Sequence, residues 1–100
     1  MYSKGDIVII QFPFSDLMNA KKRPMVVLAA KGEDIVGCAI TSNLDSDGVL
    51  LPDGLLPLKS KIKYWQIHTF LGSLVLRKAA KLPKKTHEEV LMKIEEFFSI

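Results

Sequence analysis

Short apolar runs separated by turn residues fill the first three quarters of the chain. The runs are rich in β-branched residues, each has the length of a β-strand, and Pro13 ends the first of them. No stretch between them is long enough for a crossover helix, so the pattern predicts a small antiparallel barrel or sandwich. The predicted strands are Asp6–Phe12, Met25–Ala30, Ile35–Ser42, Val49–Pro52, Ser60–Thr69 and Leu71–Leu76.

The apolar period changes near the C-terminus from that of strands to that of a helix. Thr86, with Glu89 three residues later, forms a capping-box pattern, which predicts a helix over about 86–98. We expect this helix to close one mouth of the barrel, in a single domain whose barrel spans about 5–82. Its apolar stripe consists of Val90, Leu91, Ile94, Phe97 and Phe98.

Composition places the chain among soluble globular domains. Hydrophobic residues make up 48% and charged residues 25% of its 100 residues, close to the usual averages. No apolar run approaches the ~20 residues of a membrane-spanning helix, and the N-terminus lacks a secretory cleavage pattern. Cys38 is the only cysteine, so an intrachain disulfide is excluded and the expected compartment is the cytoplasm.

Charge is unevenly distributed along the chain. Residues 1–53 carry a net charge of −2, residues 54–85 carry +8 without a single acid, and residues 86–100 carry −3. Clustered cations gain affinity by displacing counterions from phosphates, so the acid-free segment predicts a polyanionic partner. The alternative is a solvated lysine face that keeps the protein soluble.

Several kinds of chemistry find no support in the sequence. There is no metal-ligand spacing and no glycine-rich phosphate loop, so we expect neither a metal nor a cofactor. Cys38 lies within an apolar strand and is expected to be buried. His68 and His87 could in principle act as an acid–base pair, but His87 falls in the first helical turn, where a surface position is the ordinary explanation.

A series of short motifs is more informative than any single residue. In order and spacing they resemble the MazF/PemK family of toxin endoribonucleases over about residues 4–82. The motifs are Gly5-Asp6-Ile7-Val8, Phe12-Pro13-Phe14-Ser15-Asp16, Lys22-Arg23-Pro24-Met25-Val26, Ala39-Ile40-Thr41-Ser42, Leu58-Lys59-Ser60 and Trp65-Gln66-Ile67-His68-Thr69.

The resemblance implies both a fold and a function. It implies a mainly β fold, an SH3-like small barrel of the MazF/PemK/CcdB-like type with a C-terminal helix. It also implies a homodimeric toxin of a type II toxin–antitoxin system, neutralised by a cognate antitoxin peptide. Such toxins cleave single-stranded RNA, often mRNA, without a metal and leave a 2′,3′-cyclic phosphate.

The same resemblance assigns the catalytic roles to Arg23 and Thr41. A guanidinium fork can bind the nonbridging phosphate oxygens at two points as negative charge develops, and a threonine hydroxyl can orient the phosphate. Without the resemblance, Arg23 is simply an exposed arginine before a strand-initiating proline. The RNA-binding candidates are Ser15, Lys21, Lys22, Ser42, Lys59, Ser60, Lys61, Lys63, Trp65 and Gln66.

The role of Trp65 and the overall function each have alternative interpretations. Strand alternation would place Lys61, Lys63 and Trp65 on one face, where Trp65 either stacks on an unpaired base or fills a dimer interface. The function also has rivals, because the same barrel serves a non-catalytic toxin that poisons DNA gyrase. A degenerate, inactive RNA-binding module is the third reading.

Overall fold

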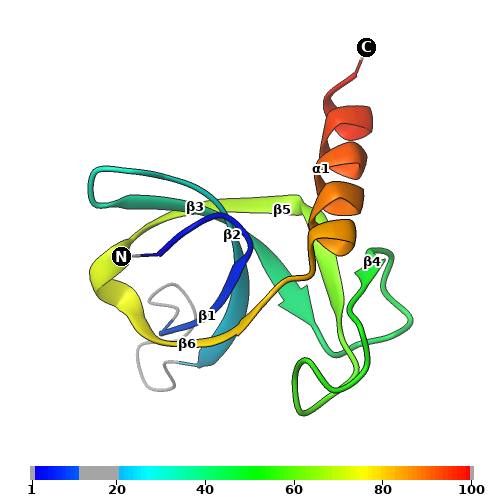
Figure 1. Cartoon of the computed structure of the whole chain (residues 1–100), viewed down its shortest axis with the longest axis horizontal. Coiled ribbons are helices and arrows are strands. Elements are labelled where there is room, and N and C mark those ends of the chain that lie inside the picture. The colour runs from blue at the N-terminus through cyan, green and yellow to red at the C-terminus, as the bar shows by residue number, and fades with distance from the viewer. Residues whose placement is uncertain (1, 12–20, 100) are drawn as a thin grey trace.

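Six strands form one antiparallel sheet, followed by a single helix (Figure 1). The computed structural model describes residues 2–11 and 21–99. The order of strands across the sheet is β4-β5-β3-β2-β1-β6. The elements are β1 (Asp6–Gln11), β2 (Lys22–Lys31), β3 (Asp34–Thr41), β4 (Val49–Leu50), β5 (Lys61–Leu71), a 3₁₀ turn (Gly72–Leu74), β6 (Val75–Lys81) and α1 (Lys84–Phe98).

The mainly β fold with a C-terminal helix is therefore confirmed, and the barrel is an open one. The sheet curls on itself (Figure 1), but β4 and β6 stand at its two ends and are not paired with each other in the described part of the chain. The predicted strand at Leu71–Leu76 was wrong in position. Gly72–Leu74 forms a 3₁₀ turn, and the last strand runs instead to Lys81, because it pairs with β1 from Asp6 to Ile10.

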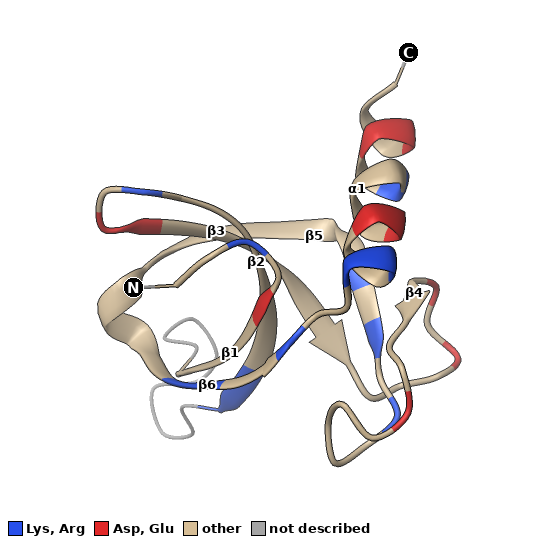
Figure 2. Cartoon of the chain, in the orientation of Figure 1, with Lys and Arg blue, Asp and Glu red and all other residues tan. Residues whose placement is uncertain are grey.

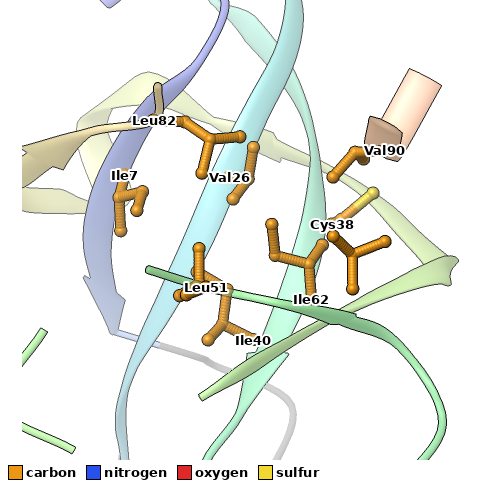
Figure 3. Close-up of a cluster of buried hydrophobic side chains, with 9 residues drawn as sticks. Ile7, Val26, Cys38, Ile40, Leu51, Ile62, Leu82 and Val90 are labelled. Atoms are coloured by element: carbon orange, nitrogen blue, oxygen red, sulfur yellow. The ribbon is translucent and has the colours of Figure 1, made fainter. Parts of the chain in front are cut away.

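Strand β1 lies between β2 and β6 and is covered on both faces. Neighbouring residues of a strand point to opposite faces, yet Ile7 and Val8 are both fully buried. Ile7 packs in a cluster with Val26, Cys38 and Val90 of α1 (Figure 3), whereas Val8 belongs to a second cluster on the other face. Full burial of a side chain of this size contributes about 1.5–3 kcal/mol.

Helix α1 starts earlier and covers less of the sheet than expected. It begins at Lys84 after the N-cap residue Pro83, whose carbonyl accepts the first helical hydrogen bond from His87 N–H at 2.9 Å. Thr86 therefore lies inside the helix, and the predicted capping box is wrong. Val90 is buried, but Phe97 and Phe98 are 54% and 66% exposed. The end of the helix extends away from the sheet (Figure 1), so most of the predicted apolar stripe remains uncovered within this chain.

The N-terminal segment is attached to β6 by a buried carboxylate. Asp6 accepts a hydrogen bond from Ser3 N–H at 2.9 Å, and its Oδ1 lies 3.2 Å from both Lys78 Nζ and Lys81 Nζ. Burial alone would raise the pKa of Asp6, but the Ser3 hydrogen bond and the two lysines outweigh it and hold this pKa below its usual value. The charged form is therefore stabilised by folding.

We expect Asp6→Asn to lower the free energy of unfolding at pH 7 by about 1–3 kcal/mol, because charge-assisted hydrogen bonds are lost. Since folding lowers this pKa, the contribution is complete above the unfolded value near ~3.9 and is lost as pH falls through the folded value. Urea unfolding at pH 7 and pH 3 should show the two proteins converging at low pH. The control is Asp53→Asn, which removes an exposed 3.8 Å ion pair with Lys59; equal effects of both substitutions would contradict the assignment.

Candidate active site

A cleft of about 530 Å³ opens where several strands end on one side of the sheet. Its lining comes from β1, the start of β2, the end of β3, the loop before β5, and β6. The apolar part consists of Ile9, Pro24, Ile40, Leu56, Pro57 and Leu58. The polar part consists of Lys21, Lys22, Arg23, Thr41, Ser42, Ser60 and Arg77.

Among the residues that the structure describes, the polar lining contains four cations and no carboxylate. Figure 2 shows the basic start of β2 and a basic segment of β6 at the same end of the sheet. Adjacent like charges raise the local potential and favour an anionic ligand. The cleft is therefore suited to phosphate, with apolar side chains available for contact with a sugar or base.

The ladder between β2 and β3 brings Arg23 and Thr41 to the same place. Its last pair at this end is Met25 with Ala39, and Arg23 and Thr41 each lie two residues beyond that pair. Residues two apart in a strand share a face, so both follow the face of Met25 and Ala39. The pairing places Arg23 and Thr41 at the same end of neighbouring strands.

The immediate contacts of this pair suit a bound phosphate. Thr41 Oγ1 accepts a hydrogen bond from Asn43 N–H at 3.1 Å, which fixes the oxygen while its proton remains able to donate. Arg23 is exposed and takes part in none of the ion pairs found within residues 2–11 and 21–99. Within these residues no carboxylate competes for the guanidinium, which has the geometry for a two-point contact with phosphate oxygens.

Ser60 also lines the cleft, but its hydroxyl is already engaged. The residue is 4% exposed, and its Oγ donates to the Leu58 carbonyl at 2.9 Å. Its backbone carbonyl accepts from Leu51 N–H at 2.9 Å. These bonds hold the loop that carries Leu56–Leu58, so the geometry favours a positioning role over direct contact with a ligand.

The remaining basic candidates lie outside the cleft lining. Lys59 is 3.8 Å from Asp53, and Lys61 donates to the Ser46 carbonyl at 3.0 Å, although Lys61 also pairs with Thr41 in the β3–β5 ladder. Lys63, Trp65 and Gln66 are likewise absent from the lining. Ser15 lies outside the residues that the structure describes.

A bulge in β5 corrects the face expected for Trp65. Lys63 pairs with Ala39 and Ile67 pairs with the adjacent Cys38, so residues 64–66 have no partners in this ladder. A bulge interrupts strand alternation and re-aims the side chains within it. Alternation therefore no longer places Trp65 with Lys61 and Lys63, and its ring meets that of Tyr64 edge-on with centroids 5.1 Å apart.

The other nucleophile and acid–base candidates are not in the cleft. Cys38 is fully buried, and burial raises the pKa of its thiol to about 12. His68 lies on β5 and His87 on α1, and neither belongs to the lining. Within the described ranges, no three His, Cys, Asp or Glu side chains gather as a metal site, and no helix is long and apolar enough to span a membrane.

Arg77 is the polar residue of the described lining that the sequence did not single out. It lies on β6, far from Arg23 in the sequence, and enters the cleft because β1 pairs with both β2 and β6. One signal was available, since Arg23 and Arg77 are the only two arginines in a chain whose other basic residues are all lysines.

The curled antiparallel sheet, its terminal helix and the basic cleft define a small, mainly β class of fold. A family model described as PemK-like, MazF-like toxin of type II toxin–antitoxin system matches residues 3–98. The match covers nearly the whole chain, so the chain belongs to this family. The expected family membership is thereby confirmed. No curated protein sequence gives a significant match.

Solved structures agree on the fold at low sequence identity. MazF from Deinococcus radiodurans is 20% identical with a TM-score of 0.79, and the match covers 99% of this chain and 97% of that chain. A MazE–MazF complex from the same organism gives 18%, a TM-score of 0.81, and coverage of 99% and 96%. An endoribonuclease from a mycobacterial species gives 12%, a TM-score of 0.71, and coverage of 95% and 88%.

We expect Cys38 to resist alkylation in the folded protein, because with a pKa of about 12 only about one thiol in ten thousand is ionised at pH 8. Iodoacetamide labelling followed by mass spectrometry should leave the native protein unmodified and label it fully in urea. Labelling of the native protein at the rate seen in urea would contradict the buried environment of this thiol.

Proposed function

We propose that this chain is the toxin of a type II toxin–antitoxin system and that it cleaves single-stranded RNA in the cleft. The observation that carries the proposal is the position of Arg23 and Thr41 together in a cleft whose described lining has four cations and no acid. Membership of the toxin family and the fold shared with the mycobacterial endoribonuclease support the same reading.

In the proposed reaction, the 2′-hydroxyl of a nucleotide attacks the phosphorus on its own 3′ side. The bond from phosphorus to the 5′ oxygen of the next nucleotide breaks, which gives a 2′,3′-cyclic phosphate and a free 5′-hydroxyl. The hydroxyl proton leaves to solvent or a base, and the departing oxygen gains a proton, so charge balances.

Each of the two catalytic residues has a distinct task in this reaction. Arg23 stays protonated at neutral pH and binds the nonbridging oxygens as their charge grows. Thr41 donates one neutral hydrogen bond that orients the phosphate. The described lining contains neither a carboxylate nor an imidazole, so these residues act by stabilising charge rather than as general bases.

The proposal extends to two protein partners. An antitoxin peptide is supported by the family and by solved complexes of MazE with MazF, which share this fold. A homodimer is supported by the large apolar side chains that this chain leaves exposed on α1. They are Leu91, Met92, Phe97 and Phe98, each at least 45% exposed.

We expect Arg23→Ala to lower the rate of RNA cleavage by about 10²–10³-fold, because it removes a preorganised charge donor from the transition state. Arg23→Lys should restore little, since an ammonium lacks the planar fork. Thr41→Ala should cost about tenfold or less, the value of one neutral hydrogen bond. The assay is cleavage of a long unstructured RNA with a chelator present, followed by end-group analysis.

The control for these variants is Lys31→Ala, which removes an exposed cation at the opposite end of β2. Full activity of Arg23→Ala would refute the assigned role of the arginine. A strict requirement for added magnesium, or gyrase inhibition without RNA cleavage, would refute the proposed function itself.

We expect light scattering at micromolar concentration to give about twice the chain mass of 11.2 kDa. The physical reason is that a dimer can cover apolar helix residues that a monomer leaves in water. Phe97→Ser combined with Phe98→Ser should shift the population toward monomer. A monomeric mass for the unmodified protein would rule out the dimer.

A further inference from the structure

Arg77 lines the cleft but has no role in the function proposed above. The chain contains 14 basic residues, of which only Arg23 and Arg77 are arginines, and both line the same cleft. Arginine presents a rigid fork that matches phosphate at two points, whereas lysine provides a point charge. The guanidinium groups of both arginines therefore belong to the lining of one cleft.

The register of β1 fixes where Arg77 lies relative to β2. Ile9 pairs with Pro24 on one side and with Arg77 on the other. Directly paired residues share a face of the sheet, and strands are about 4.8 Å apart, so the Cα atoms of Arg77 and Pro24 are separated by about 10 Å. Arg23 pairs instead with Ile10, so alternation starts it on the other face of the sheet. The two arginines come together at the strand ends, where both line the cleft.

A local irregularity sets Arg77 apart from the rest of β6. Ile9 pairs with Arg77, but the next residue, Ile10, pairs with Val75, so Leu76 is an extra residue in the ladder. Bulges of this kind bend a strand and redirect its side chains. Arg77 comes directly after the extra residue, and it is exposed at the cleft.

The cations of β6 are used in two different ways. Lys78 and Lys81 both lie 3.2 Å from the buried Asp6 and belong to the folded framework. Arg77 takes part in none of the ion pairs in the described part of the chain and shares its cleft with three other cations. A bound anion would relieve the mutual repulsion of these cations, and no side chain of the described lining can do so.

We infer that Arg77 binds a second backbone phosphate of the RNA strand, next to the phosphate held by Arg23 and Thr41. The inference rests on the proposed function for the identity of the ligand, and it makes Arg77 a positioning residue. With one phosphate held by Arg77, the partner of Ile9, and another by Arg23, the partner of Ile10, the strand is fixed in direction before the reaction. The apolar segment Leu56–Leu58 provides the surface that faces this phosphate track.

The test is binding of a short single-stranded oligonucleotide whose 2′-hydroxyls are methylated, so that it cannot be cleaved. Fluorescence anisotropy across a range of salt concentrations measures both affinity and its salt slope. Arg77→Ala should weaken binding about tenfold and reduce the slope by about 0.7, the value for one phosphate on a single strand. Arg77→Lys should keep the slope but recover only part of the affinity.

Lys31→Ala is the matched control, because it removes one exposed positive charge from the same sheet outside the cleft lining. It should change affinity by less than twofold. An Arg77→Ala protein whose affinity and slope equal those of Lys31→Ala would overturn the inference. Absence of oligonucleotide binding by the unmodified protein would overturn it as well.

Cleavage kinetics separate this inference from the proposed function. With cleavable RNA, Arg77→Ala should raise KM by about tenfold and lower kcat by a smaller factor, whereas Arg23→Ala acts mainly on kcat. If the unmodified protein binds the methylated strand through Arg77 but never cleaves RNA, the proposed nuclease activity is refuted, whereas the phosphate site at Arg77 is supported. If it cleaves RNA and Arg77→Ala changes neither constant, only the phosphate site fails.

Discussion

The double pairing of β1 is the constraint on which the rest of the molecule depends. This short strand is hydrogen-bonded to β2 on one side and to β6 on the other, and its side chains fill clusters on both faces of the sheet. Its first residue, Asp6, holds two lysines of β6. Near its other end, Ile9 separates the strand segments that carry Arg23 and Arg77, so the same strand that builds the core also assembles the cleft.

Charged residues are distributed unevenly over this protein, and their positions matter more than the net charge. The buried Asp6 is shared by two lysines of β6, and Asp53 lies beside Lys59. All charged residues of the described cleft lining are cations. The net charge of the whole chain is only +3, yet the cleft is strongly basic. Such an arrangement keeps the fold free of large internal repulsion and concentrates the positive potential where an RNA backbone would bind.

Local patterns predicted the elements that depend on local chemistry. The β-branched runs predicted five of the six strands in nearly the right places. The family resemblance, rather than a local pattern, singled out Arg23, Thr41 and Lys22, which the structure brings to one cleft. What failed depends on pairing between distant segments. The last strand, the bulge at residues 64–66 and the approach of Arg77 all follow from ladder register, which no local pattern specifies. The predicted helix start was wrong for a local reason, because the helix begins directly after Pro83, before Thr86.

The most direct test of the account is a crystal structure of the protein with a 2′-O-methylated single strand bound. The account predicts consecutive phosphates in the cleft, one contacting Arg23 and the Thr41 hydroxyl and the next contacting Arg77, with nucleotide surface against Leu56–Leu58. A strand that instead follows Lys59, Lys61 and Lys63 and leaves the cleft empty would contradict it.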